Sequence, residues 1–185
     1  LSSDRLLLSG VAVSFVLMAA ANMLLFMGDH RSSSAVMFWM MGGLGSARWE
    51  LISLPACVIA IGGTVLWMFS RSLNALTVGE QTAVSLGVDA HWVRIGIFIV
   101  ASLMTGVLVA LSGSIGFVGL MVPHIARGLV GAAHRRLLPV CALLGALLVA
   151  CLDIVARKLV APQDLPIGVV TAAFGGLFFF MQRNR

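Results

Sequence analysis

The 185-residue chain is 60% hydrophobic and only 10% charged, and its mean hydropathy is +1.06. Ordinary soluble domains carry about 25% charged residues, so a soluble fold could not cover this much apolar surface. The composition predicts an integral membrane protein with many short spans and little soluble mass. The net charge of +5 does not indicate nucleic-acid binding, because the basic residues are scattered between apolar runs and form no stripe.

Six apolar segments are predicted to cross a bilayer, which requires about 20 apolar residues each. They are residues 6–28, 51–70, 93–112, 115–133, 137–157 and 165–182. A shorter run, AVMFWMMGGLG (35–45), is predicted to be a helix in or near the membrane interface, where Trp39 and Trp49 would be favoured. The predicted fold is therefore all-α: one polytopic domain over residues 1–185, with six transmembrane helices and short additional helices.

The orientation in the membrane follows from the placement of Lys and Arg. Six spans put both ends of the chain on one side. That side would carry eight basic residues: Arg5, Arg71, Arg94, Arg127, Arg135, Arg136, Arg183 and Arg185. The other side would carry four: Arg31, Arg48, Arg157 and Lys158. The richer side is predicted to be cytoplasmic, which places both chain ends and residues 71–94 inside, and residues 29–50 and 157–164 outside.

Residues 73–92, LNALTVGEQTAVSLGVDAHW, form the longest polar stretch of the chain. Thr77 and Glu80 fit the capping box, in which each side chain satisfies a backbone N–H of the other residue. Gly87 lies where a left-handed C-terminal stop is expected. The pattern predicts a helix over 78–86, which is too short to be stable alone in water, so another surface must pack on it.

Either another protein or the lipid surface could pack against this short helix. Ala83 and Ser85 are expected to be exposed, and because they are small they would allow another protein to approach closely. The alternative is a helix lying on lipid. Interfacial helices usually carry Lys or Arg on their polar face, and residues 73–92 contain neither, which favours protein docking.

The most distinctive segment is SGSIGFVGLMVPHIARGLVGAAHRRLLP, residues 112–139. Gly113, Gly116 and Gly119 recur at every third position, and small residues at helical spacing let neighbouring backbones approach closely in a membrane. Pro123 removes a backbone hydrogen bond and is expected to kink or interrupt the span. The segment is not a phosphate-binding loop, because it lacks the glycine spacing and the lysine of that motif.

No residue pattern predicts a metal or cofactor site. His124 and Arg127 lie one turn apart, but a histidine beside a proline is more often a packed, hydrogen-bonded residue than a ligand. Cys57, Cys141 and Cys151 all lie inside apolar runs without metal-ligand spacing. We interpret these cysteines as small buried hydrophobic residues.

Asp153 and Arg157 are four residues apart near the outer end of the fifth predicted span. They therefore lie on one helical face and can pair. Charged side chains at membrane depth are rare, and they are usually paired or functional.

Residues 113–139 resemble the signature of the FecCD/BtuC family of permease subunits, which belong to ATP-binding-cassette importers of iron–siderophores, haem and cobalamin. Nearly the whole chain resembles the family in the same order: LNALTVGEQTAVSLGV its cytoplasmic loop, FWMMGGLGSARW its external helix region, and LDIVARKLVAPQDLPIGVVTAAFGGLFF its last two spans. One departure is Gly176, where the family usually has Ala-Pro or Ser-Pro, and which would soften a break in the final helix.

The resemblance implies a subunit of about ten helices that works as a pair. The six predicted spans would correspond to helices five to ten, so the chain, which opens on Leu1, is expected to be the C-terminal portion of such a subunit in the cytoplasmic (inner) membrane. Its expected cargo is an iron(III)–siderophore-type chelate, with haem or cobalamin as alternatives. Its implied partners are a cytoplasmic ATPase subunit that binds ATP and Mg²⁺, an extracytoplasmic substrate-binding protein, a second permease subunit and the lipid bilayer. No catalytic site and no cofactor are implied for this chain.

The resemblance also implies roles for individual residues. The coupling segment would be residues 73–89, which contact the ATPase through Glu80, Ala83, Ser85, Leu86 and Gly87. Arg157 would engage an acidic residue of the substrate-binding protein; the alternative is an arginine that Asp153 holds at the membrane surface, and both can be true. Structural or gating roles are expected for Gly113, Gly116, Gly119, Pro123, His124, Arg127 and Asp153.

Two other classes of membrane protein fit the sequence less well. A secondary transporter or channel would place ionisable residues near the bilayer centre, whereas Asp153 lies toward the end of its span. An intramembrane enzyme would need a catalytic pair. His124 with Ser112 or Ser114 is the candidate pair, but these positions are about three helical turns apart. No Walker lysine motif, H-E-x-x-H or nucleophile elbow is present.

Overall fold

The computed structural model describes residues 3–45, 47–159 and 165–183. The chain divides into two compact units, Leu1–Met40 and Met41–Arg185, which are described separately below as unit 1 and unit 2.

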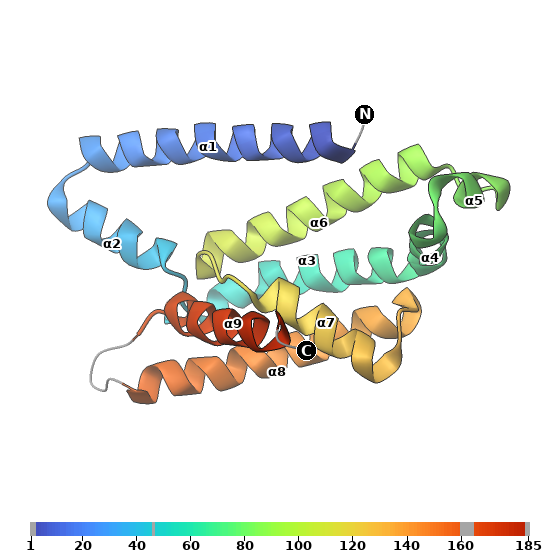
Figure 1. Ribbon diagram of the computed structural model, residues 1–185. Helices are drawn as coiled ribbons and strands as arrows, with labels where there is room; N and C mark the ends of the chain where they lie inside the picture. The colour runs from blue at the N-terminus through green and yellow to red at the C-terminus, as the bar shows by residue number, and fades with distance from the viewer. Residues whose placement is uncertain (1–2, 46, 160–164, 184–185) are drawn as a thin grey trace. The chain divides into compact units, whose positions relative to one another are not determined.

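Unit 1 is a pair of helices joined by a tight turn (Figure 1). Helix α1 covers Ser3–Met27 and α2 covers His30–Met40. The Ser33 hydroxyl donates to the carbonyl of Leu25 at 3.0 Å, which ties the start of α2 to the end of α1. Helix α1 is apolar on every side, with Phe15 and Leu24 both 72% exposed, as expected for a helix whose surroundings are lipid or other apolar helices.

Unit 2 contains the remaining described helices (Figure 1). They are α3 (Trp49–Met68), α4 (Ser70–Val78), α5 (Glu80–Ser85), α6 (Ala90–Ser112), α7 (Val118–Val130), α8 (His134–Leu159) and α9 (Ile167–Arg183). Helix α3 packs along α6, and α7 packs along α8, which also contacts α9. The expectation of an all-α fold is confirmed.

Four of the described helices, α1, α3, α6 and α8, are long and apolar enough to cross a membrane. They correspond to the predicted spans 6–28, 51–70, 93–112 and 137–157. The prediction of 115–133 is wrong in length, because α7 has 13 residues. The predicted segment 165–182 nearly coincides with α9, which has 17 residues. Helix α7 starts late because Gly113 ends α6 with a φ of 68° and residues 113–117 form a loop.

Helix α7 runs through Pro123 without interruption, so the kink stays a prediction. Helix α9 runs through Gly176 without a break, in line with the expectation that glycine softens one. Two smaller expectations are wrong. The predicted interfacial helix over 35–45 continues only to Met40, since Gly42 turns the chain with a φ of 73°. Gly116 lies in the loop before α7 rather than in a helix, so the three glycines do not form one helical stripe.

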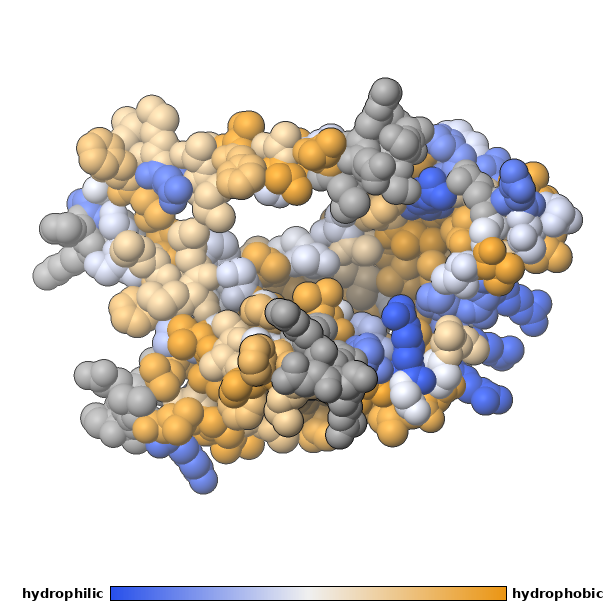
Figure 2. All heavy atoms as spheres, viewed as in Figure 1, coloured by the Kyte–Doolittle hydropathy of each residue, from blue (hydrophilic) through white to orange (hydrophobic). Residues whose placement is uncertain are grey.

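The two ends of unit 2 differ in chemistry. The first, which we call the α5 end, comprises α4, α5, the end of α7 and the starts of α6 and α8; the opposite end comprises residues 41–48, 113–117, the end of α8 and the start of α9. Hydrophilic residues gather over the α5 end in Figure 2. Its basic residues are Arg71, Arg94, Arg127, Arg135 and Arg136, whereas Arg48, Arg157 and Lys158 belong to the opposite end. The predicted grouping of these eight residues is confirmed. The side chains of Arg5, Arg31, Arg183 and Arg185 lie outside the described residues.

The core of unit 2 lies toward the opposite end, where Leu152 and Ala156 of α8 pack against Ile167 and Val170 of α9. Backbone hydrogen bonds join the segments that meet at this end. The N–H of Gly43 donates to the carbonyl of Ser112 at 2.8 Å, and the N–H of Gly168 donates to that of Gly42 at 3.4 Å. No larger residue fits at position 168, since a methyl group on Gly168 would overlap the Met41 carbonyl oxygen.

Close approach in unit 2 depends on other glycines than the predicted ones. A methyl group added to Gly116 or Gly119 would meet nothing within 4 Å among the described residues. By contrast, one added to Gly175 of α9 would overlap the Cβ and ring of Phe117. Phe117 precedes α7 with a φ of 64°, the one positive value for a non-glycine residue in the described ranges. Gly175 therefore makes room for the turn that starts α7.

We predict that Gly175→Ala destabilises the protein by about 1–3 kcal/mol, because the added methyl group overpacks the contact with Phe117. The neighbouring Gly176→Ala is the matched control, since a methyl group there meets nothing within 4 Å and alanine favours the helix. Melting temperatures of the purified full-length permease in detergent check this. Equal melting temperatures for both variants would contradict the packing described here.

Candidate functional site

The α5 end is built around a helix of six residues with a well-defined stop. In α5 the N–H of Val88 donates to the carbonyl of Ala83 at 3.0 Å, and the N–H of Gly87 donates to that of Val84 at 2.9 Å. This is the Schellman pattern, which needs a left-handed residue, and Gly87 has a φ of 77°. The predicted C-terminal stop at Gly87 is confirmed.

The predicted start of this helix is wrong. Thr77 lies in the last turn of α4, and its hydroxyl donates to the carbonyl of Asn74 at 2.7 Å. A capping box needs the threonine in an extended conformation before the helix. Gly79 instead separates α4 from α5 with a φ of 138°, so α5 begins at Glu80 rather than at residue 78. The side chain of Glu80 lies outside the described residues.

The exposed surface of α5 also differs from the prediction. Ala83 is fully buried, with 0% of its surface exposed, whereas Val84 is 61% and Leu86 68% exposed. Ala83 was predicted to be exposed, but the face of α5 that carries it packs toward α4 and α6. Ser85 is exposed as predicted, and its hydroxyl donates to the Thr82 carbonyl at 2.8 Å. We refer to Val84, Ser85, Leu86 and Gly87 as the α5 patch.

The position of α5 is set on one side by the start of α6. Asp89 is the N-cap of α6, and its Oδ1 accepts hydrogen bonds from the N–H groups of His91 at 3.1 Å and Trp92 at 3.3 Å. Only three residues separate the end of α5 from this cap. Asp89 was not among the predicted site residues, although an aspartate directly before an apolar run is a recognised start signal.

On its other side the α5 end is tied to α8. Oδ1 of Asn74 in α4 accepts the backbone N–H of His134 at 3.0 Å and lies 2.6 Å from its Nδ1. The indole Nε1 of Trp67 in α3 donates to the carbonyl of Arg135 at 3.1 Å, and the Arg135 guanidinium lies 5.4 Å from the centre of the Trp67 ring. These contacts join residues 60 and 68 positions apart, so no local pattern could have predicted them.

At the opposite end, Nε of Arg157 donates to Oδ2 of Asp153 at 2.9 Å, which confirms the predicted pair. The Arg157 side chain is 48% exposed and that of Asp153 is 22% exposed. An ion pair of this kind on a helix contributes only about 0.3–0.5 kcal/mol. Its main consequence is therefore that the exposed guanidinium is held in one direction.

The other predicted site residues are not brought together. The ring of His124 in α7 meets the ring of Phe178 in α9 edge-on, with centroids 6.1 Å apart, but His124 is otherwise exposed. Arg127 lies in the last turn of α7 and is exposed. Throughout the described ranges, no group of three or more His, Cys, Asp or Glu residues could hold a metal ion.

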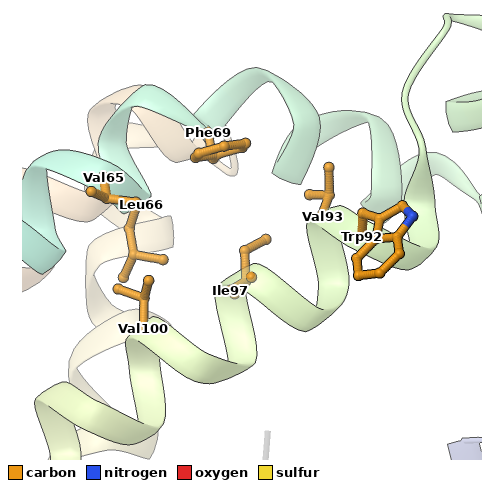
Figure 3. Close-up of a pocket in the computed structure, with 8 residues that line it drawn as sticks. Val65, Leu66, Phe69, Trp92, Val93, Ile97 and Val100 are labelled. Carbon is orange, nitrogen blue, oxygen red and sulfur yellow. The ribbon is translucent and has the colours of Figure 1, made fainter.

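A hollow of about 240 Å³ lies between the end of α3 and the start of α6 (Figure 3). Leu66 of α3 and Val100 of α6 point toward one another across it. The other lining residues are Val65, Phe69, Trp92, Val93, Gly96 and Ile97. A ligand site needs a few convergent polar groups in an apolar lining, and the Trp92 indole is the single polar side-chain group here. The hollow therefore does not have the chemistry of a chelate-binding site.

Comparison with known proteins assigns the family. The FecCD transport family matches residues 1–183, and the chain therefore belongs to it. The hemin transport system permease protein HmuU of Yersinia pestis is 38% identical over 181 residues, which cover 95% of this chain and 52% of that protein. The vitamin B12 import system permease protein BtuC of Citrobacter koseri is 40% identical over 181 residues, covering 97% of this chain and 54% of that protein.

The fold is also similar to a solved structure. That structure is an inward-facing conformation of an ABC transporter described as being of the metal-chelate type. It matches with a TM-score of 0.91 and 34% sequence identity, over 96% of this chain and 58% of that one. The chain spans about half the length of the curated relatives it matches.

We predict that Asp89→Ala destabilises the protein by about 1 kcal/mol, because the first N–H groups of α6 lose their acceptor. Asp89→Ser, which keeps a capping oxygen, serves as the control and should stay close to the parent protein. The melting temperature of the purified full-length permease is the measurement. An unchanged value for Asp89→Ala would mean that the cap does not stabilise α6.

Proposed function

We propose that this chain is the membrane-spanning part of a permease subunit in an ATP-binding-cassette importer of the cytoplasmic membrane. The observation that carries the proposal is the likeness to an ABC transporter structure at a TM-score of 0.91 over 96% of the chain, within a family match over residues 1–183. The chain would line part of the pathway through which the cargo crosses the membrane and would catalyse no reaction itself. A separate ATPase subunit would bind ATP and Mg²⁺.

In this proposal the six apolar helices α1, α3, α6, α7, α8 and α9 correspond to helices five to ten of a ten-helix subunit. Helix α7 is only about 20 Å long at 1.5 Å per residue, less than the hydrocarbon thickness of about 30 Å. The loop 113–117 would complete that crossing. Non-helical backbone is tolerated at membrane depth where protein covers it, and Gly113 is buried.

The α5 end is proposed to face the cytoplasm, and with it both ends of the chain. Five of the eight described basic residues of unit 2 belong to this end, in line with the excess of Lys and Arg on cytoplasmic loops. The opposite end, with Arg157, would then face a substrate-binding protein outside. A second permease subunit, identical or paralogous, would complete the pathway.

The proposed cargo is a bulky metal chelate of the iron(III)–siderophore type, with haem and cobalamin as the alternatives. The named relatives transport hemin and vitamin B12, so size and a central metal are common to the class. Uptake of radiolabelled ferric siderophore, haem and cobalamin by cells that carry the complete transporter separates the three. Uptake of none of them would overturn the assignment of cargo.

We predict that Val84→Asp combined with Leu86→Asp abolishes co-purification of the ATPase subunit. Both side chains are exposed in the α5 patch, and each aspartate would place an unpaired charge in an apolar contact, at a cost of about 2 kcal/mol or more. The control Leu86→Met keeps the size and apolar character and should retain the ATPase. Retention of the ATPase by the double variant would refute docking through α5.

We predict that Arg157→Glu weakens binding of the substrate-binding protein at least tenfold, because an attractive contact with an acidic residue becomes repulsive. Lys158→Glu makes the same change of charge one position along α8 and should have a much smaller effect. Affinities measured on the complete transporter in nanodiscs check this. Equal losses for both variants would indicate general attraction by charge and not a contact made by Arg157.

A further inference from the structure

The start of α8 leaves backbone groups that its own helix cannot satisfy. The residue before it, Ala133, has an apolar side chain and cannot cap the first N–H groups as serine or aspartate would. Its carbonyl accepts the N–H groups of Arg136 at 3.0 Å and Leu137 at 2.9 Å, but the N–H of His134 has no partner within the helix. An unsatisfied donor of this kind is costly near the membrane.

Pro139 creates a second unsatisfied group in the same turn. Proline has no N–H, so the carbonyl four residues earlier loses its helical partner. That carbonyl belongs to Arg135. The first turn of α8 therefore presents N–H groups without a helical partner, that of His134 among them, and one carbonyl, that of Arg135, whose partner Pro139 removes.

Two side chains from the segment that leads into α5 satisfy the His134 N–H and the Arg135 carbonyl. Nε1 of Trp67 donates to the Arg135 carbonyl at 3.1 Å, in the place of the N–H that Pro139 lacks. Oδ1 of Asn74 accepts the His134 N–H at 3.0 Å, as an N-cap side chain would. We call Trp67 and Asn74, with the backbone groups that they bind, the α8 joint.

The chemistry of the joint also determines the tautomer of His134. Because the backbone N–H of His134 can only donate, the atom of Asn74 that faces it must be the amide oxygen. The same oxygen lies 2.6 Å from Nδ1 of the imidazole, so Nδ1 carries the proton and donates as well. The side chain at position 74 must therefore accept two hydrogen bonds, one from the backbone N–H of His134 and one from its Nδ1–H.

The α8 joint lies between the two proposed docking surfaces. Asn74 is in α4, which is separated from α5 by Gly79 alone. Helix α8 then runs for 26 residues, which is about 39 Å, and carries Arg157 in its last turn. Because the α8 partners in the joint are backbone atoms, a displacement of α4 that preserves the Asn74 hydrogen bond displaces the start of α8 with it.

We propose that the α8 joint transmits movement between the α5 patch and the Arg157 end of the permease, with Trp67 and Asn74 as positioning residues. The proposal rests on the proposed function of the α5 patch and Arg157, and it adds the residues that link them. Coupling free energies between two such sites are typically 1–3 kcal/mol, which is about a 5- to 150-fold effect of one ligand on the other.

The test uses the complete transporter in nanodiscs, and it measures how far cargo-loaded binding protein stimulates ATP hydrolysis. Asn74→Ala should retain the ATPase subunit on purification but lose stimulation by roughly fivefold or more. Asn74→Asp keeps the acceptor oxygen and should restore it. Stimulation of Asn74→Ala equal to the parent, failure of Asn74→Asp to restore it, or loss of the bound ATPase in Asn74→Ala would each overturn the proposal.

A second variant separates transmission from folding. Trp67→Phe leaves the Arg135 carbonyl unpaired and should lower the melting temperature. Adding Pro139→Ala restores the missing N–H within α8 and should recover the melting temperature, while stimulation stays low because α3 and α8 are no longer bonded. Recovery of both quantities would assign Trp67 a structural role alone and overturn its part in the proposal.

Failure of this inference can be told apart from failure of the proposed function. If the Val84 and Leu86 variant loses the ATPase while Asn74→Ala behaves like the parent protein, the docking assignment stands and the joint is refuted. If the Val84 and Leu86 variant retains the ATPase, the docking assignment is itself wrong.

Discussion

The structure depends on one constraint, which is that a backbone N–H or C=O without a partner in its own helix needs a partner elsewhere, in the protein or in water. Every departure from regular helix must therefore be answered by another part of the protein or by water. The carbonyl of Arg135, left unpaired by Pro139, is bound by Trp67, and the first N–H of α8 is bound by Asn74. At the opposite end, the N–H of Gly43, in the loop before α3, donates to the carbonyl of Ser112 at the end of α6. In this protein, some contacts between helices are hydrogen bonds to backbone groups that have no partner within their own helix.

The same constraint explains where small residues matter. Loops and helices can exchange backbone hydrogen bonds only if their main chains come close, and a Cβ atom often prevents this. Gly42 and Gly168 meet the requirement at the opposite end, where a methyl group on either would overlap a backbone carbonyl. Gly175 meets it by leaving room for Phe117. Glycine spacing within a helix, as at Gly119, has no such consequence among the described residues of this chain.

The two ends of unit 2 are chemically different, and α8 connects them. The α5 end combines basic residues with a short helix that has a well-defined stop and an exposed patch including Val84, Ser85 and Leu86. The opposite end has a guanidinium held by Asp153. A helix that is too short to be stable alone is here fixed by Asp89 on one side and, through α4, by Asn74 on the other. This arrangement suits a surface that must keep its shape when another protein moves it.

Composition and local pattern determined the membrane class, the four long spans, the stop at Gly87 and the pairing of Asp153 with Arg157, because each depends on hydropathy, on φ or on a spacing of four residues along one helix. The resemblance of its motifs to those of known permeases indicated the family. Tertiary structure alone decided that Ala83 is buried, since packing against α4 and α6 selects the exposed face of so short a helix. It also decided that α7 starts at Val118, and that Trp67 and Asn74 bind α8. Those contacts join atoms about 60 residues apart, and no periodicity in a single sequence records which distant side chain will satisfy an unpaired backbone group.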